Sequence, residues 1–241
     1  MIELSGLTKT YNRGQVKAVD ALDLSVRAGE VFGFLGPNGA GKTTTIKMMV
    51  GLLRPDRGSI RMAGYDLAGS PLEVKRRLSY VPDNPDIYQR LTGIEYLNFL
   101  ADVYRVKAEE RQERIPHLLE LFALTRVVAD PIKSYSHGMR HKIVLVGALL
   151  HDPMIFIMDE PMVGLDPRSA HHFKEILRDR CAHGRAVFFS THILEVAEKL
   201  CDRIGIIHKG KLIALGTMDE LRDQARDKES LEQIFLELTE T

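Results

Sequence analysis

Gly36-Pro37-Asn38-Gly39-Ala40-Gly41-Lys42-Thr43 is the stretch that decides the fold, because it fits the pattern G-x-x-x-x-G-K-[ST] of a phosphate-binding loop (Walker A). Glycines let the backbone bend until successive N–H groups point at one phosphate. Lys42 supplies a full positive charge for the outer phosphates, and the Thr43 hydroxyl is a ligand for Mg²⁺. Residues 36–44, including Thr44, are therefore predicted to bind a nucleoside triphosphate with Mg²⁺.

The flanks of the loop have the composition that this motif requires. Residues 31–35 are a short apolar run typical of a strand, and residues 43–50 place Ile46, Met49 and Val50 on one face of a helix. A helix N-terminus carries about half a positive charge, which favours a phosphate there. The alternative is a glycine-rich turn that contains Lys and Thr by chance. The order strand, loop, helix favours the nucleotide site.

Composition limits the class of protein. The chain has 241 residues, 44% of them hydrophobic, which indicates one large domain or a domain with a lobe. The 33 basic and 33 acidic residues cancel, so we expect no nucleic-acid partner. Cys181 and Cys201 lack metal or redox spacing and are interpreted as reduced thiols.

Two features bear on location. Residues 1–4 carry a charge where a signal peptide needs an apolar run, and the longest apolar stretches, such as residues 143–150, are shorter than the ~18 residues that span a bilayer. We therefore expect a cytoplasmic chain that lies at the inner face of the cell membrane only through a membrane subunit.

Periodicity predicts two kinds of sheet. Residues 2–31 alternate between apolar and polar, which indicates antiparallel strands with a turn at residues 12–14. Further along, apolar runs without alternation are separated by helices, as in a parallel sheet. The predicted strands are 59–62, 78–81, 154–158, 186–190 and 204–208; residues 54–58 and 63–66 are predicted as a loop and a turn; helices are predicted from Pro71, at 167–181 and at 192–199; and a hairpin turn is predicted at Lys209-Gly210.

Residues 83–150 have a helical character. Thr92 followed by Glu95 is a capping-box pattern, and apolar residues then recur at helical spacing up to Tyr104. A second helix is expected at about 108–122. We predict a helical segment, 83–150, inserted into a core made of 1–82 and 151–216, with a helical tail at 217–241, all within a single domain of residues 1–241.

An apolar strand at 155–158 ends in the carboxylates Asp159 and Glu160. A strand beside the loop strand would place Asp159 at the Mg²⁺, directly or through water. Glu160 would then act as general base on an attacking water. Alternatively, the strand is simply entering a loop, but the phosphate-binding loop favours the metal role.

Taken together, these motifs resemble an ATP-binding cassette (ABC) ATPase, the engine of an ABC transporter, over almost the entire chain. This resemblance implies an α/β P-loop NTPase (RecA-like) core with a mainly parallel sheet, an N-terminal antiparallel β subdomain and an inserted α-helical subdomain. The matching pieces lie in family order at residues 36–43, 135–140, 159–160, 164–167 and 190–192.

The resemblance also implies roles for single residues. Tyr11 would stack on the adenine ring, where the alternative is ordinary strand packing. His192 resembles the switch histidine that holds the γ-phosphate and the attacking water, where the alternative is a helix cap. Asp166 would lie on the loop that crosses between two cassettes.

The segment at 135–140 resembles the family's signature, which faces the γ-phosphate held by a second cassette. Ser136, as N-cap, and Gly138, as a close-approach residue, match the common Leu-Ser-Gly-Gly-Gln form, whereas Tyr135, His137 and Met139 depart from it. His137 is expected near that phosphate, or else facing solvent. With His141 at i+4 it supplies two metal ligands without a third, so no metal site is predicted there.

Asp83 stands where the family often has a Gln that contacts Mg²⁺, so we expect Asp83 to reach the cation through water. Acidic residues here resemble the exporter-type (ABC-2-like) branch, whose membrane subunits are separate chains. We expect the membrane contact on residues 83–104, where Pro85, Ile87, Tyr88 and Leu91 are apolar; inward packing is the alternative.

The resulting prediction is a cassette that hydrolyses ATP, dimerises around two Mg-ATP with a second cassette of the same or another chain, and drives an integral-membrane permease, for export. One alternative is a cassette ATPase that acts away from membranes, although this chain has one cassette and no coiled-coil insert. Another is a nucleotide-gated interaction module with little hydrolysis. The tail places Leu231, Ile234, Phe235 and Leu238 on one helix face, which packs either on the core or on a second protomer.

Overall fold

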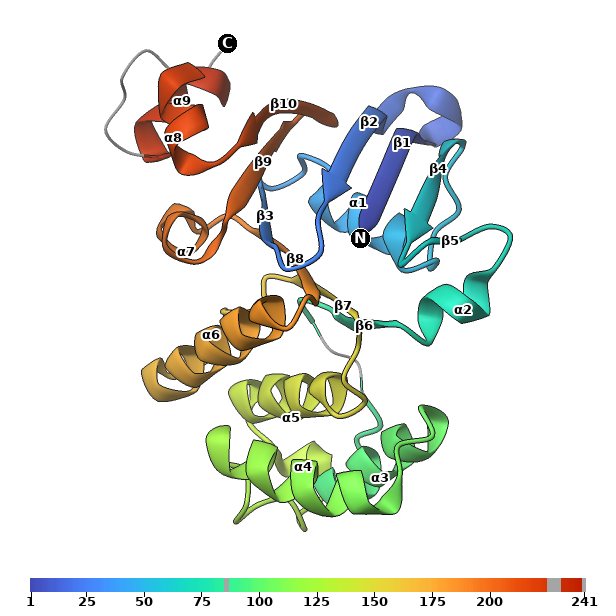
Figure 1. The fold of residues 1–241 in the computed structure, drawn as a ribbon, viewed down its shortest axis with the longest axis vertical. Coiled ribbons are helices and arrows are strands. Elements are labelled where there is room, and N and C mark those ends of the chain that lie inside the picture. The colour runs from blue at the N-terminus through green and yellow to red at the C-terminus, as the bar shows by residue number, and fades with distance from the viewer. Residues whose placement is uncertain (85–86, 225–230, 240–241) are drawn as a thin grey trace.

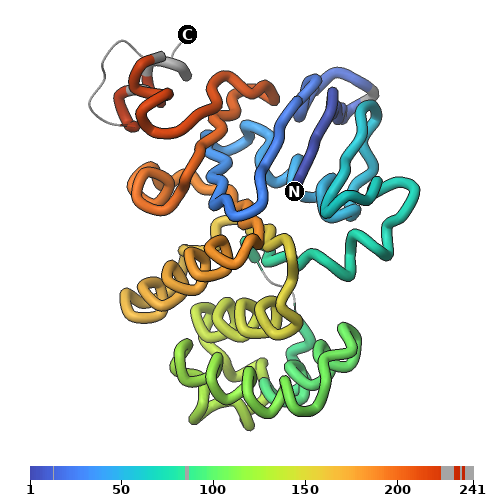
Figure 2. Tube along the Cα trace, viewed as in Figure 1, coloured from blue at the N-terminus to red at the C-terminus, as the bar shows by residue number. Residues whose placement is uncertain are grey.

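The protein combines two sheets with a group of helices, as a computed structural model that describes residues 1–84, 87–224 and 231–239 shows. The sheets lie in the upper part of Figure 1, and the helices α3 (Gly93–Val103), α4 (Ala108–Leu121) and α5 (His137–Leu149) lie below them. We call these three helices the helical lobe. In Figure 2 the chain enters the helical lobe in green, after the core strand β6 (Leu78–Val81), and leaves it in yellow.

The larger sheet has the order β10-β9-β3-β8-β7-β6, and its strand pairs are parallel except β9 with β10. The predicted parallel sheet is therefore confirmed. However, β8 lies between β3 and β7, so the expectation that the strand before Asp159 lies beside the loop strand is wrong. The remaining strands of this sheet are β3 (Val31–Leu35), β7 (Ile155–Asp159), β8 (Ala186–Thr191), β9 (Arg203–His208) and β10 (Lys211–Gly216).

The smaller sheet is antiparallel, with the order β2-β1-β4-β5, and the predicted turn at residues 12–14 is confirmed. Two predictions nearby are wrong in detail. Residues 65–66, predicted as a turn, pair with β4, and residues 57–58, predicted as loop, already belong to β4, because register with neighbouring strands extends it. The strands are β1 (Ile2–Tyr11), β2 (Val16–Val26), β4 (Arg57–Met62) and β5 (Tyr65–Asp66).

The apolar runs of β3, β7 and β8 are fully buried, because both faces of the larger sheet are covered. Neighbouring residues of a strand face opposite sides. Phe188 therefore packs with the smaller sheet, whereas Phe189 packs with the helical lobe and with α6. Other helices are α1 (Lys42–Met49), α2 (Pro71–Lys75), α6 (Pro167–Ala182), α7 (Leu194–Leu200), α8 (Met218–Gln224) and α9 (Leu231–Thr239), with short 3-10 turns at Asn12–Gly14 and Ile132–Ser134.

The predicted capping box at the start of α3 is confirmed. The Glu95 N–H donates to the Thr92 hydroxyl oxygen at 3.3 Å, and the Thr92 N–H donates to the Glu95 carboxylate at 2.8 Å. These two bonds satisfy N–H groups that the helix itself leaves unpaired. The capping box therefore fixes the residue at which the first helix of the helical lobe begins.

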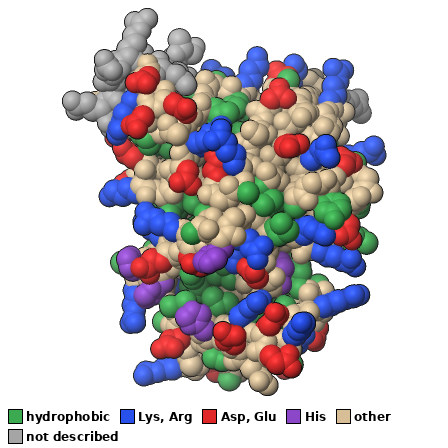
Figure 3. All heavy atoms as spheres, viewed as in Figure 1, with side chains coloured by type: hydrophobic (Ala, Val, Ile, Leu, Met, Phe, Trp, Pro, Cys, Tyr) green, Lys and Arg blue, Asp and Glu red, His purple; other side chains and the backbone are tan. Residues whose placement is uncertain are grey.

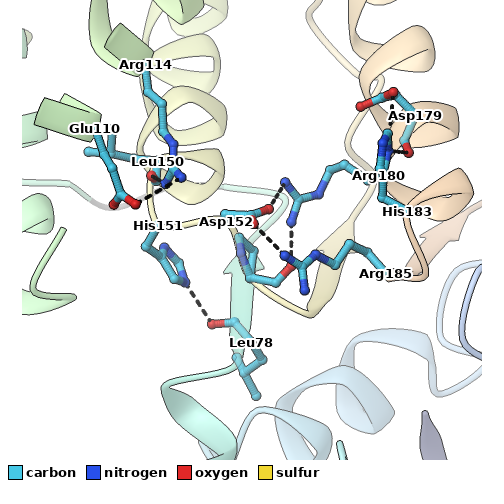
Figure 4. Close-up of polar contacts among 11 residues, drawn as sticks. Leu78, Glu110, Arg114, Leu150, His151, Asp152, Asp179, Arg180, His183 and Arg185 are labelled. Atoms are coloured by element: carbon cyan, nitrogen blue, oxygen red, sulfur yellow. Dashed lines mark hydrogen bonds and ion pairs between the residues drawn. The ribbon is translucent and has the colours of Figure 1, made fainter. Parts of the chain in front are cut away.

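The link from α5 to β7 ties the helical lobe to the core (Figure 4). His151 Nε2 lies 3.3 Å from the Leu78 carbonyl oxygen, and the His151 ring stacks on Tyr104 with centroids 3.6 Å apart. Asp152 accepts hydrogen bonds from Arg180 at 3.0 Å and from Arg185 at 2.5 Å. The sequence pattern did not predict this network, whose members are far apart in the chain.

Two other features follow from the described residues. Leu231 is fully buried, and both it and Phe235 pack against a cluster around Leu35 and Ile204; the side chains of Ile234 and Leu238 lie outside the described part. This favours packing of the tail on its own core.

Within the described ranges, none of the helices combines the length and the apolar character needed to cross a membrane. On the face in Figure 3, acidic and basic side chains are interspersed.

Candidate nucleotide site

The glycine loop connects β3 to α1 and approaches neighbouring backbone closely. A Cβ on Gly36 would lie 2.4 Å from the Ile207 carbonyl oxygen, and one on Gly41 would lie 2.3 Å from the Ala18 carbonyl oxygen. Gly41 also has a φ of 113°, which side chains other than glycine rarely adopt. No described side chain caps α1, so the N–H groups at its start remain available for an anion.

Lys42 lies over the loop rather than in solvent, with 7% of its surface exposed. Its ammonium donates to the carbonyl oxygens of Gly36 at 2.6 Å and Pro37 at 3.2 Å. Burial lowers the pKa of Lys42, and the Glu160 and Asp159 carboxylates oppose that shift. A largely desolvated ammonium held by backbone oxygens is suited to a polyanion that replaces these contacts.

Asp159 is held through both carboxylate oxygens. The Thr43 hydroxyl donates to Oδ2 at 2.7 Å, and the Ser190 hydroxyl donates to Oδ1. β8 separates β7, which ends at Asp159, from β3, which leads into the glycine loop. Thr43 nevertheless reaches Asp159, because α1 packs against β7. The intervening strand supplies Ser190, which sequence reasoning placed in a matching motif without assigning it a role.

Glu160 follows β7 in an unusual backbone conformation, with a φ of 53°. Its Oε1 lies 2.8 Å from His192 Nδ1, so the two predicted catalytic side chains are in contact. Oε2 is buried and has no hydrogen-bond partner within the described part of the chain. A buried carboxylate oxygen that lacks a protein partner is suited to hold a water or a ligand.

Lys42, Thr43, Asp159 and Glu160 line one cavity of about 160 Å³. Asp83 lines it too, so the structure brings all three predicted metal-binding residues, Thr43, Asp159 and Asp83, to the loop. Hydroxyl and carboxylate oxygens are the donors that Mg²⁺ prefers, so this set fits the ion. The lining residues are Pro37, Asn38, Gly39, Gly41, Lys42, Thr43, Asp83, Asp159 and Glu160.

The signature-like residues lie outside this cavity. Ser136 is the N-cap of α5, as predicted: its side chain accepts from the Met139 N–H at 3.2 Å. Ser136 and His137 are exposed, and Gly138 is half-buried. The chain does not bring the start of α5 to its own loop.

His137 and His141 face different environments. His141 Nε2 lies 3.0 Å from the Pro161 carbonyl oxygen, and burial lowers the pKa of the His141 imidazole. His137, by contrast, is exposed. No group of three potential metal ligands was found among residues 1–84, 87–224 and 231–239.

Two further predicted residues, Tyr11 and Asp166, are accessible, whereas Ala40 is buried and Thr44 is half-buried. Tyr11 ends β1 with 41% of its surface exposed. Asp166 is the N-cap of α6, where it accepts from the Ser169 N–H at 3.0 Å, and it forms an ion pair with Lys142. The Lys142 ammonium, with Ser169, holds the pKa of Asp166 well below its usual range. Lys142 was not predicted, because only the fold brings it to Asp166.

Comparison with known proteins shows which family the chain resembles in sequence. The family model described as "ABC transporter" matches residues 19–163. The linearmycin resistance ATP-binding protein LnrL of Bacillus subtilis is 39% identical over 221 residues, covering 92% of this chain and 70% of its own. The daunorubicin/doxorubicin resistance ATP-binding protein DrrA of Streptomyces peucetius is 41% identical, covering 92% and 66%. EcsA of Bacillus subtilis, an ABC-type transporter ATP-binding protein, is 35% identical, covering 99% and 96%.

Solved structures of ATP-binding cassettes have the same fold as this chain. One described as "Structure of ATP binding subunit of ABC transporter" has a TM-score of 0.94 and 37% identity, and 99% of each chain is covered. The cassette MJ0796, in a dimeric structure with ADP and Pi, has a TM-score of 0.81 at 23% identity over 90% of this chain and 99% of its own, which shows a shared fold. The expected α/β fold, with its antiparallel sheet and inserted helices, is confirmed. The chain belongs to the ABC transporter family, as one of its ATP-binding proteins.

Proposed function

We propose that this chain hydrolyses ATP with Mg²⁺ and that hydrolysis drives a separate membrane subunit, for export. The observation that carries the proposal is that Glu160, which contacts His192, lines the same cavity as Lys42 and Asp159. A base, a cation and metal-binding carboxylates at one loop are the groups that phosphoryl transfer to water requires.

Each residue has a part in this reaction. Lys42 and the loop N–H groups hold the outer phosphates, and the accessible Tyr11 stacks on the adenine. Thr43, Asp159 and, through water, Asp83 would hold Mg²⁺, which would offset the negative charge of the phosphates. His192 keeps Glu160 oriented through Oε1. Glu160 Oε2 accepts the proton of the attacking water, since Oε2 is the oxygen without a protein partner.

A second cassette completes the site in our proposal. Ser136, His137 and Gly138 mark the start of α5, whose N–H groups favour an anion, yet they lie outside the cavity of their own chain. In a head-to-tail dimer they would cover the γ-phosphate held by the other copy, and Asp166 would lie on the crossing loop. The dimeric structure of MJ0796 with ADP and Pi, a protein of the same fold, supports this arrangement.

A groove of about 320 Å³ between core and helical lobe suits the membrane subunit. Beside it, Tyr88 and Phe99 form an edge-on aromatic pair with centroids 5.5 Å apart, and they are 61% and 43% exposed. Exposed aromatic pairs of this kind are typical of interfaces. Ile87 and Leu91 pack partly inward, and Pro85 lies outside the described residues. The groove is lined by residues that include Leu78, Tyr80, Tyr96, Leu100 and Tyr104.

The direction of transport is taken from relatives. LnrL and DrrA are resistance proteins by name, which supports export of a compound from the cell. We therefore propose that the chain works in the cytoplasm at the inner face of the membrane, bound there by its permease.

Phosphate release tests the enzymatic part. The wild-type chain should release phosphate from ATP in a Mg²⁺-dependent reaction, and Lys42→Met should abolish release because the cation for the outer phosphates is lost. Absence of release by the wild-type chain, both alone and with its membrane subunit, would contradict hydrolysis and favour a nucleotide-gated interaction module.

Co-purification tests the transport part. Tyr88→Asp combined with Phe99→Asp should remove an integral-membrane protein that co-purifies with the wild type. Val16→Asp, on the smaller sheet, is the control, since Val16 is similarly exposed at 48%. If no membrane protein accompanies the wild-type chain, the alternative of a cassette that acts away from membranes gains support.

A further inference from the structure

The segment from Glu160 to Asp166 connects the proposed general base to α6, and it is compact. The Val163 N–H donates to the Glu160 carbonyl oxygen at 3.2 Å, and the Leu165 N–H donates to the Met162 carbonyl oxygen at 3.4 Å. Internal bonds of this kind make the segment move as a unit. A shift at its far end therefore reaches the backbone of Glu160.

One face of α5 contacts this segment at its beginning, middle and end. His141 Nε2 lies 3.0 Å from the Pro161 carbonyl oxygen. A Cβ on Gly138 would lie 2.8 Å from the Gly164 carbonyl oxygen, so the two backbones are in close contact. The Lys142 ammonium pairs with the Asp166 carboxylate. Gly138, His141 and Lys142 are spaced i, i+3, i+4, which places them on one side of a helix.

The Lys142 side of the ion pair with Asp166 is largely buried, whereas the Asp166 side chain is 47% exposed. Only 12% of the Lys142 side chain is exposed, against 66% for Lys199 in its pair with Glu195 on α7. An ammonium largely removed from water depends on its partner, whereas an exposed pair contributes little. Asp166 also accepts from Ser169, so Lys142 joins α5 to the first turn of α6.

We propose that Lys142 is a positioning residue that fixes residues 160–166 on α5, so that the helical lobe sets the position of Glu160 within its own chain. The consequence for catalysis rests on the proposed function, in which Glu160 activates water. A partner that displaces the helical lobe would then move the general base of the same cassette. The α5–β7 link in Figure 4 holds the opposite end of α5 to the core, so a displacement of the helical lobe would move the start of α5, which contacts this segment.

Kinetics of Lys142→Met test the catalytic consequence. Methionine is unbranched like lysine and only one atom shorter, and it carries no charge; Lys199→Met is the matched control. We expect kcat to fall at least about tenfold, as misplacement of a catalytic group does, while the Kd for Mg-ATP stays within about threefold. Lys142→Arg should keep most of the wild-type kcat, because it restores the ion pair.

Hydrogen exchange tests the positioning itself and needs no turnover. In Lys142→Met, the backbone amides of residues 162–166 should exchange faster, whereas those of β7 and α1 should not change. Asp166→Asn, which removes the charge from the other side and keeps a capping oxygen, should give the same local pattern. If wild-type turnover is absent, the proposed function fails, but this measurement still decides the role of Lys142.

Two results would overturn the inference. One is unchanged amide exchange at residues 162–166 in both variants. The other is a general loss, with faster exchange throughout the core and nucleotide affinity falling in parallel with kcat, since that would make Lys142 a stabilising residue only.

Discussion

His151 is a half-buried imidazole in the α5–β7 link, and its environment makes the stability of the protein depend on pH. Because Nε2 contacts the Leu78 carbonyl oxygen, the neutral ring carries its proton there (Figure 4). A second proton would have to go to Nδ1, which is buried and has no partner among the described residues. Burial, together with the Arg180 and Arg114 charges, lowers the pKa of His151 to about 4.

The size of the effect follows from linkage. An unfolded histidine has a pKa of about 6.5. Since the folded pKa is lower, the unfolded state binds more protons between these two values, and stability present above pH 6.5 is lost as pH falls toward 4. From pH 7.5 to pH 5 the free energy of unfolding should fall by about 2 kcal/mol through this residue.

Urea unfolding of His151→Phe measures this term. Phenylalanine keeps the stack on Tyr104 but does not titrate, and it leaves the Leu78 carbonyl without its bond, which costs about 1 kcal/mol at every pH. The loss of stability between pH 7.5 and pH 5 should therefore be about 2 kcal/mol smaller than in the wild type. His117→Phe, at an exposed position, should leave the wild-type pH dependence in place. An equal pH dependence in His151→Phe and wild type would refute the reasoning.

Three further changes test other parts of the structure. Asp152→Ala removes the carboxylate that pairs with the largely buried Arg180. The free energy of unfolding should fall by about 2 kcal/mol, which corresponds to a fall of about 4–8 °C in Tm by calorimetry. An unchanged Tm would contradict the role of this link. Ser190→Ala frees one oxygen of Asp159, so the Mg²⁺ dependence of nucleotide binding should weaken about tenfold while binding in EDTA is unchanged, and Ser190→Thr should behave as wild type. Gly41→Ala would place a Cβ 2.3 Å from a backbone oxygen of β2, and nucleotide affinity measured by titration should fall at least about tenfold; wild-type affinity would show that the loop tolerates a shift.

Local features of this fold could be predicted from the sequence because short-range physics determines them. The apolar run before Gly36, the capping box at Thr92 and the turn at residues 12–14 each depend on neighbouring residues alone. Strand order, by contrast, does not depend on neighbouring residues alone. Nothing in residues 155–159 records that β8 separates them from β3, and the adjacency expected from the motif was wrong.

The candidate site divides in the same way. Lys42, Thr43, Asp159 and Glu160 stand in motifs with fixed spacing, and the structure gathers them around one cavity. Lys142 contacts Asp166, and Ser190 contacts Asp159, only because α5 and β8 pack against other elements. An isolated lysine or serine carries no periodic signal, so only the folded chain reveals its contacts.

In the proposed site, Glu160 acts as base and a second cassette covers the phosphate. The mass of Glu160→Gln in solution, measured by light scattering with Mg-ATP, tests both parts together. We predict that ATP converts this variant to a lasting dimer that releases no phosphate, whereas without ATP it keeps the mass of one chain. A variant that stays monomeric with ATP, or that releases phosphate at the wild-type rate, would contradict the account.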